Sequence, residues 1–407
     1  MSRPAPDRPT LDLLDGSSYV EGAYERYGWF REHEPVAWDD VNELWGVFRY
    51  ADVEHVETHD EVFISSDTSK GGYRPNIPAD PALLGTDNPL HAQRRKLVSR
   101  RFTPRAVAGH ETEVRAIVTE LLDAAIAAGR VEIVSELASV LPARMIGRLL
   151  GFPDESWPRL RDWSEQTIML GGGPRYLDHA GVMAAHEFMQ AALDLYAQRQ
   201  QCPADDVMTL WTQGHIDDRP ISPREVASDC LALLDGGAET TRTVIARTML
   251  ELIARPDQWQ LLCDGADLGV AVEEFIRWVS PIHNMCRVAN RDYPLGGVTV
   301  RAGQQVVLMY GSANRDPAHF KEPSRFDVTR RPNDHLAFGV GTHFCLGAGL
   351  ARLEIRVFFE ELVRRVESMQ AVSAPVEMPN AFVFGLREAR VALRPRVLSE
   401  LSEPASL

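Results

Sequence analysis

The spacing of apolar residues predicts amphipathic helices through the middle of the chain. Residues 111–128 show the pattern most clearly, because their apolar positions recur every three or four residues and fall on one helical face. These positions are Val114, Ile117, Val118, Leu121 and Leu122. Residues 91–102, 182–199 and 270–279 are also predicted to be helical, and the first of these stretches is basic.

The longest predicted helix begins after Ser222 and extends to about Ala254. Residues 222–225, Ser-Pro-Arg-Glu, match a capping box with proline at the first helical position. Halfway along the helix, Gly236 and Gly237 each weaken it by roughly 1 kcal/mol relative to alanine. Such a cost indicates a purpose, and we expect the helix to widen locally at the two glycines.

Strand patterns are short and lie toward the two ends of the chain. They cover residues 44–50, 298–300, 305–309, 382–384 and 390–393. The predicted fold class is therefore mainly α with small β-sheets. We expect the strand near Leu44 to pair with C-terminal segments, which favours a single domain over residues 1–398. Residues 399–407 are expected to form a flexible tail.

Composition and charge narrow the class of protein. Of the 407 residues, 44% are hydrophobic and 25% are charged, which indicates a globular chain with an ample core. The net charge of -15 argues against general nucleic-acid binding. The five cysteines lack Cys-x-x-Cys spacing, so we expect a reducing compartment and no disulfide framework. The N-terminus is polar, and no apolar stretch approaches the roughly 20 residues of a membrane span, so we expect a cytoplasmic protein.

Cys345 is the one cysteine whose surroundings suggest chemistry. Residues 338–347 are Phe-Gly-Val-Gly-Thr-His-Phe-Cys-Leu-Gly, and an amphipathic helix is predicted over residues 348–363. Gly339 and Gly341 allow a tight loop whose backbone N–H groups can point at the sulfur. Those groups, and a helix N-terminus behind the cysteine, favour the thiolate over the thiol. The segment is therefore suited to hold iron through sulfur.

Two further positions in this segment fit a flat iron-binding macrocycle. Phe338 can shield the sulfur from water, and Gly347 removes a side chain where the macrocycle must lie. The alternative is a glycine-rich turn that contains a buried cysteine by chance, and the ten-residue spacing argues against it. The segment matches Phe-Gly-x-Gly-x-His-x-Cys-x-Gly, so the sequence resembles the cytochromes P450. The resemblance implies the P450 fold, with haem b as cofactor, Cys345 as its proximal iron ligand and dioxygen as co-substrate.

The long helix carries residues that resemble the oxygen-activating part of this family. Glu239 and Thr240 are similar to its acid–alcohol pair, which delivers protons during oxygen activation. The alternative is a solvated glutamate beside a threonine that bonds back to the preceding turn. Asp235 departs from the family, which usually has an apolar residue there. Since Asp235 and Glu239 share a helix face, either one pKa is raised, or Asp235 contacts a polar part of the substrate, or it forms a salt bridge.

The resemblance also implies residues that attach the haem and support the core. Glu274 and Arg277 match the family's Glu-x-x-Arg motif, and Arg325 is implied as the third member of that buried network. The donors implied for the haem propionates are His91, Arg95, Arg287 and His343.

Four segments are implied to line the substrate pocket, namely residues 65–84, 167–173, 279–285 and 382–384. The candidate pocket residues are Asp235, Gly236, Ile282 and Val383. In detail the chain is most similar to actinobacterial P450s that oxidise sterol side chains and branched lipids. Terpenes, macrolides and other secondary metabolites stay open, because the matching stretches mostly surround the haem.

The expected reaction is hydroxylation of a lipophilic small molecule by a monomeric enzyme. Electrons from NAD(P)H are expected to arrive through a ferredoxin reductase and a ferredoxin, because the chain has no flavin or iron–sulfur motif. Basic residues between positions 94 and 105, with Arg352 and Arg356, form either a ferredoxin-docking face or a solvated surface. One alternative function is a peroxygenase that uses hydrogen peroxide, and another is a non-catalytic haem protein such as a sensor.

Overall fold

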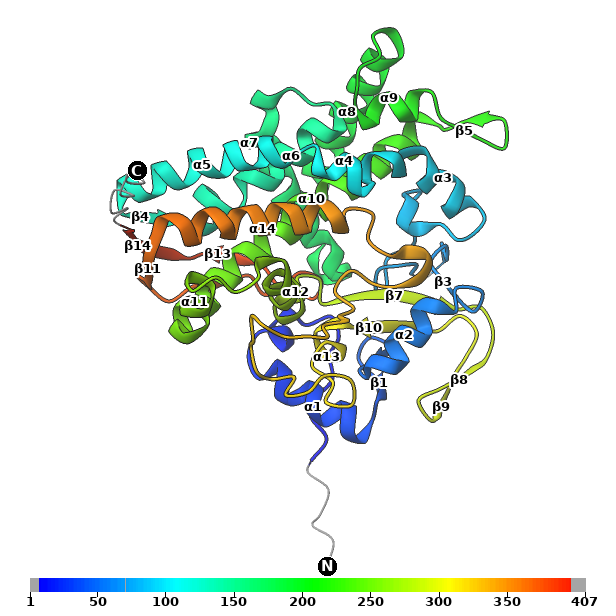
Figure 1. The fold of residues 1–407 in the computed structure, drawn as a ribbon. Helices are drawn as coiled ribbons and strands as arrows, with labels where there is room; N and C mark the ends of the chain where they lie inside the picture. The colour runs from blue at the N-terminus through cyan, green and yellow to red at the C-terminus, as the bar shows by residue number, and fades with distance from the viewer. Residues whose placement is uncertain (1–6, 70, 397–407) are drawn as a thin grey trace, which may run out of the picture.

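The computed structural model of the protein describes residues 7–69 and 71–396. Helices make up most of this part and the sheets are small, which confirms the predicted fold class (Figure 1). The tail expected at residues 399–407 lies outside the described residues. Within the described ranges, no helix combines the length and the apolar character that crossing a membrane requires.

The helices account for the elements predicted from periodicity, and several bounds agree to within a residue or two. They are α1 (Ala23–His33), α2 (Tyr50–Thr58), α3 (Leu90–Ser99), α4 (Pro104–Ala108), α5 (Glu111–Ala128), α6 (Val140–Leu150), α7 (Trp157–Thr167), α8 (His179–Gln201), α9 (Val207–Thr212), α10 (Pro223–Ala254), α11 (Pro256–Cys263), α12 (Leu268–Val279), α13 (Tyr310–Ala313) and α14 (Ala348–Arg365).

The strands are short and come from both halves of the chain. They are β1 (Val36–Asp39), β2 (Leu44–Val47), β3 (Phe63–Ile64), β4 (Arg130–Glu132), β5 (His215–Ile216), β6 (Arg219–Pro220), β7 (Asn284–Ala289), β8 (Tyr293–Leu295), β9 (Val298–Val300), β10 (Gln305–Met309), β11 (Val366–Ala371), β12 (Val376–Glu377), β13 (Leu386–Glu388) and β14 (Arg390–Pro395).

The two larger sheets connect segments that are distant in sequence. One has the order β1-β2-β10-β7-β3, and the other has the order β11-β14-β4. β2 pairs in parallel with β10, so its C-terminal partner is the segment Gln305–Met309 rather than the last strands of the chain. The strand expected at residues 382–384 is reduced to an isolated bridge between Val383 and Ile282.

α10 is the central helix, and it begins at the predicted capping box. The Ser222 N–H donates to the Glu225 carboxylate at 2.8 Å, and the Glu225 N–H donates back to the serine hydroxyl at 3.3 Å. The helix packs against α6, α7, α8, α12 and α14 (Figure 1). Because these helices cover α10 on several sides, its 32 residues carry a long apolar surface.

The two glycines of α10 do not widen the helix, contrary to the sequence prediction. The α-helical hydrogen bonding continues through them. A Cβ atom on Gly237 would lie 3.0 Å from Ile146 of α6, whereas a Cβ atom on Gly236 would meet nothing within 4 Å. Gly237 therefore permits close helix packing, and Gly236 leaves open space because it has no side chain.

The Glu274–Arg277 pair forms the centre of a buried network behind the site. Both side chains are 0% exposed, and Arg277 donates to both Glu274 oxygens at 2.7 and 2.8 Å. The predicted third member, Arg325, is wrong, because its side chain is 58% exposed and lies 3.6 Å from Glu322. Arg330 takes that place and donates through Nε to Glu274 at 3.0 Å.

Candidate active site

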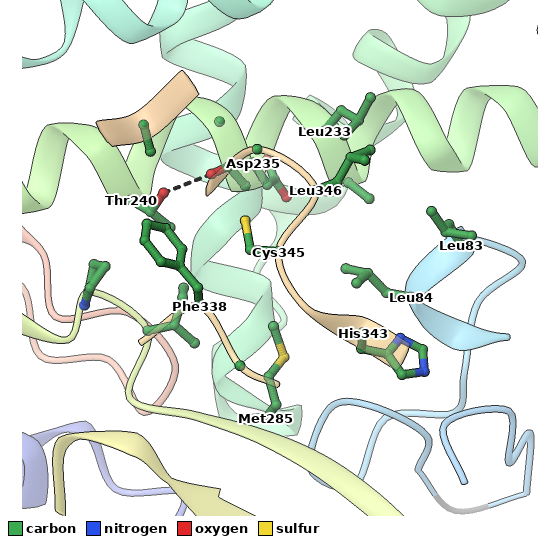
Figure 2. A pocket seen from close by; sticks show the side chains of 18 of the residues that line it. Leu83, Leu84, Leu233, Asp235, Thr240, Met285, Phe338, His343, Cys345 and Leu346 are labelled. Carbon is green, nitrogen blue, oxygen red and sulfur yellow. Dashed lines mark hydrogen bonds between the residues drawn. The ribbon is translucent and has the colours of Figure 1, made fainter. Parts of the chain in front are cut away.

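A cavity lies between α10 and the loop that precedes α14. Its empty space amounts to about 1860 Å³, part of which opens to solvent. Figure 2 shows the Cys345 sulfur and Phe338 on the loop, facing Thr240 and Asp235 on the helix. The cavity therefore joins the cysteine segment and the acid–alcohol segment, which are more than a hundred residues apart in the sequence.

The cysteine loop is tightly turned, as its glycines predict. Gly339 and Gly341 have φ angles of 65° and 71°, which few other residues adopt without strain. The Cys345 N–H donates to the Phe338 carbonyl at 2.9 Å and closes the loop. A buried carboxylate from α2 holds the loop from outside, since Glu57 accepts the Val340 N–H at 2.7 Å.

Backbone amides on the helix side of the loop face the sulfur. Burial raises the pKa of the Cys345 thiol, while the N–H groups of Gly347 and Ala348 act in the opposite direction. This agrees with the expectation that loop N–H groups and a helix N-terminus behind Cys345 favour the thiolate. Both N–H groups lie where α14 begins directly after Gly347, and the Ala348 N–H also donates to the Cys345 carbonyl at 3.4 Å.

The four predicted propionate donors all line the cavity. The His91 ring lies 4.1 Å from the His343 ring, and burial together with the charge of Arg287 lowers the pKa of His343 to about 2. His91 Nε2 is buried and has no hydrogen-bond partner among the described residues. Arg95 likewise makes no ion pair within the described ranges. His91 and Arg95 thus have hydrogen-bond donors that an acidic ligand can use.

Two glycines give the cavity room for a flat cofactor. A Cβ atom on Gly347 would meet nothing within 4 Å, and the same holds for Gly236 across the cavity. With the sulfur of Cys345 beside one and the hydroxyl of Thr240 near the other, the donor set and the open space fit a haem. The orphaned Nε2 atom of His91 fits the same group, because a haem carries propionates that accept hydrogen bonds.

The side chains of Glu239 and Thr240 leave α10 in different directions and have different surroundings. The Thr240 hydroxyl lines the cavity and donates to the Gly236 carbonyl at 2.7 Å, which is the back-bonded arrangement weighed as the alternative (Figure 2). Glu239 is 1% exposed, so it is not the solvated residue of that alternative. It pairs with Arg242, and burial raises its pKa to about 7. Arg242 in turn lies 3.5 Å from the half-exposed Glu165.

Asp235 is a buried cavity residue with an unusual environment for a carboxylate. The Thr167 hydroxyl donates to its Oδ1 at 2.6 Å. Burial raises the pKa of Asp235 to about 7, while the Thr167 hydrogen bond and the charge of Arg74 act in the opposite direction. A raised pKa is one of the states expected for this residue, and the salt-bridge alternative is wrong because no ion pair within the described residues includes it.

Comparison with known proteins agrees with this geometry. The cytochrome P450 family model matches residues 268–393. A Mycobacterium tuberculosis protein named steroid C26-monooxygenase is 36% identical over 399 residues, which cover 96% of this chain and 98% of the relative. The chain belongs to the cytochrome P450 family. It is accordingly a monooxygenase that uses haem b and dioxygen.

Solved P450 structures share the whole fold. A Mycobacterium marinum P450 in complex with pseudoionone has a TM-score of 0.87 and 31% identity, and the match covers 96% of this chain and 99% of that one. A Bacillus megaterium P450 in complex with testosterone has a TM-score of 0.85 and 29% identity, with coverage of 93% and 99%. The ligands in these two complexes are both lipophilic.

The predicted pocket segments of this P450 largely reach the cavity. Asp235, Gly236 and Ile282 line it, but Val383 does not. Val383 is 0% exposed and forms a bridge with Ile282, so it points into the protein. Phe382 lines the cavity instead, because successive side chains of an extended segment point to opposite sides.

The basic face expected near the cysteine side is smaller than the sequence suggests. Arg94 is 1% exposed and pairs with Asp229 at 2.7 Å, so it belongs to the interior. Arg101, Arg352 and Arg356 are each engaged by a carboxylate. The basic residues that stay exposed without an ion pair in the described ranges are Lys96, Arg100 and Arg105.

Proposed function

We propose that this P450 hydroxylates a steroid or a similarly lipophilic small molecule at a C–H bond. The observation that carries the proposal is a largely apolar cavity that contains both Cys345 and Thr240. The relative named steroid C26-monooxygenase supports a substrate of this class. An apolar wall suits such a substrate, because binding removes apolar surface from water and leaves a few polar groups to orient the molecule.

On the thiolate side, the proposed iron ligand is the Cys345 sulfur. Haem b, when bound, supplies the iron chemistry by which one atom of dioxygen enters the substrate. The N–H groups of Gly347 and Ala348 favour the charged sulfur, and Phe338 beside it excludes water. Gly339 keeps the loop turned around the sulfur. The proposed propionate donors are His91, Arg95, Arg287 and His343.

On the oxygen side, Thr240 and Glu239 are proposed to move protons. The Thr240 hydroxyl faces the cavity and can pass a proton to oxygen while it accepts another. Glu239, with a pKa of about 7, is able both to release and to take up a proton near neutral pH. Arg242, which pairs with Glu239 and lies 3.5 Å from the half-exposed Glu165, is proposed to hold the Glu239 carboxyl in place, because a guanidinium keeps its proton and cannot relay one.

The proposed electron donor is a ferredoxin, which is itself reduced by an NAD(P)H-dependent ferredoxin reductase. Lys96, Arg100 and Arg105 are exposed on one stretch of chain and suit an acidic partner. A peroxygenase is the competing function. The pairing of a cavity hydroxyl with a titratable buried carboxyl favours the monooxygenase, because proton delivery is needed to reduce dioxygen.

The Cys345→Ser variant tests the haem-thiolate assignment, with Cys202→Ser as control. Cys202 is exposed and lies at the C-terminal end of α8, away from the cavity. Reduced wild type and control are expected to show a strongly red-shifted Soret band with carbon monoxide, and Cys345→Ser is expected to lose it. If Cys345→Ser kept this band, the assignment of Cys345 as the iron ligand would be refuted. Equal turnover with hydrogen peroxide alone and with the ferredoxin system would favour the peroxygenase.

A further inference from the structure

Two charged side chains in the cavity wall are not used by the haem attachment described above. Arg74 lies on the segment between β3 and α3, and Asp235 lies on α10. The wall around them is mainly apolar or aromatic and includes Tyr73, Leu84, Ile168, Ile282 and Phe382. A charged group in such surroundings costs free energy unless a partner compensates it. The partner of each group is therefore informative.

The Arg74 guanidinium has aromatic neighbours and no acceptor. It lies 5.4 Å from the centroid of the Tyr73 ring and 5.4 Å from that of Phe382. Its Nε atom is buried without a hydrogen-bond partner, and no ion pair in the described part of the chain includes it. Asp80 is a nearby carboxylate, but it is exposed and accepts the Tyr73 hydroxyl at 3.1 Å. Arg74 thus holds unused donors beside a cavity.

Of the other three arginines in the cavity wall, two are compensated within the protein and the third, Arg95, is a proposed propionate donor. Arg94 pairs with Asp229 at 2.7 Å. Arg287 donates to the Cys286 carbonyl at 2.8 Å and lies 3.6 Å from Glu57. Arg95 faces the cysteine side and interacts electrostatically with Cys345. Within the described residues, the guanidinium of Arg74 therefore lies against aromatic rings and no carboxylate pairs with it. Its charge is available to a ligand.

Asp235 does not compensate Arg74 either. It interacts with Arg74 through space without closing an ion pair, and its Oδ1 is taken by the Thr167 hydroxyl at 2.6 Å. Asp235 lines the cavity, its Oδ2 atom makes no hydrogen bond within the described residues, and burial raises the pKa of the carboxyl to about 7. A protonated Asp235 is a hydrogen-bond donor, so the two residues together offer donors from two elements of the wall.

We propose that Arg74 and Asp235 form a receptor for a carboxylate carried by a lipophilic substrate. Arg74 donates to the carboxylate through its planar fork, and Asp235 in its protonated form donates to the same group. A carboxylate suits this site because it accepts several hydrogen bonds in one plane. The inference rests on the proposed hydroxylation of a lipophilic molecule and narrows its substrate to lipophilic acids.

Binding of matched acids and esters to the haem-loaded protein tests this inference. The ligands are cholanic acid and dodecanoic acid, each compared with its methyl ester, which has the same skeleton without the charge. Affinity is measured by isothermal titration calorimetry and by the change in Soret absorption. Wild type is expected to bind the acids at least about tenfold more tightly than the esters, because charge-assisted hydrogen bonds to a half-buried arginine are stronger than those to a neutral ester.

Three variants locate the receptor. Arg74→Leu is expected to weaken acid binding at least about tenfold and to leave ester binding nearly unchanged. Asp235→Asn, which keeps a donor and removes the partial negative charge, is expected to bind the acids as tightly as wild type or more tightly. The control is Arg224→Leu, because Arg224 is exposed in the first turn of α10 and does not line the cavity.

Equal affinity of wild type for acid and ester would overturn the carboxylate receptor. So would an equal loss of acid and ester affinity in Arg74→Leu, which would indicate general packing. A failure of the proposed function has a different signature. In that case the reduced protein with carbon monoxide lacks the red-shifted Soret band, whichever ligand binds.

Discussion

Arg330, rather than Arg325, should stabilise the core behind the haem. Arg330 Nε donates to Glu274 at 3.0 Å, and its other nitrogens donate to the carbonyls of Lys321, Glu322 and Arg325. Its side chain is 9% exposed. The Arg325 side chain is 58% exposed and has only a 3.6 Å contact with Glu322. Substitution of each arginine by methionine keeps much of the side-chain volume and removes the charge.

The expected cost of Arg330→Met follows from what Glu274 retains. Glu274 keeps two hydrogen bonds from Arg277, one from the Asp327 N–H at 2.8 Å and one from the Asn333 side-chain amide at 3.2 Å, so its charge stays compensated. The loss is therefore smaller than the roughly 3–5 kcal/mol of a fully broken buried pair. One charge-assisted bond and the carbonyl contacts amount to about 2–3 kcal/mol. Arg325→Met should stay within about 0.5 kcal/mol of wild type, as exposed pairs do.

Urea unfolding of the haem-loaded proteins, followed by tryptophan fluorescence and Soret absorption, measures the difference. The midpoint of Arg330→Met is expected to fall clearly below those of wild type and Arg325→Met, with an unchanged slope. A larger decrease for Arg325→Met than for Arg330→Met would refute the assignment and restore the prediction made from sequence.

Two further variants test the oxygen side and a buried carboxyl. Thr240→Ala should reduce the product formed per NAD(P)H severalfold and release hydrogen peroxide instead; unchanged coupling would contradict a role in proton delivery. Glu354 of α14 has no partner for Oε2 among the described residues, and burial raises its pKa from 4.5 to about 8. The folded protein keeps this proton when the unfolded chain has lost it, so wild-type stability should fall as the pH rises from 4.5 to about 8. Glu354→Gln should lessen that fall by several kcal/mol, since each pKa unit is worth about 1.4 kcal/mol. The unfolding midpoints of wild type and variant are measured across this pH range, and parallel profiles of the two proteins would refute the prediction.

The helices and the cysteine loop were predictable because local signals determine them. The capping box at Ser222 and the apolar period of residues 111–128 act within a few turns of helix, and α10 and α5 begin and end where these signals predict. The signature around Cys345 is equally local, because the turn at Gly339 and the helix start at Gly347 need only neighbouring residues. Because neighbouring residues determine where such an element begins, its position along the sequence cannot shift far.

Residues whose role depends on distant partners were not predictable in the same way. Glu57 is a single glutamate in α2 without a motif, yet it holds the cysteine loop from more than 280 residues away through the Val340 N–H. Arg330 lies five residues beyond the arginine that the motif indicated, and only the path of the irregular loop decides which of the two reaches Glu274. Neither residue carries a periodic signal.

The substrate wall shows why the cofactor could be read from sequence and the substrate could not. Cytochromes P450 hold haem through the same kind of cysteine loop, so Cys345 and its neighbours follow a fixed pattern. The wall is assembled from the loop of Arg74, from Ile168 directly after α7 and from Phe382, which meet only through the fold. Asp235 was conspicuous because it departs from the family pattern, but its meaning depends on Thr167 and Arg74, which no spacing connects to it. A departure from a motif therefore identifies where specificity is built, and the structure is needed to say for which chemistry.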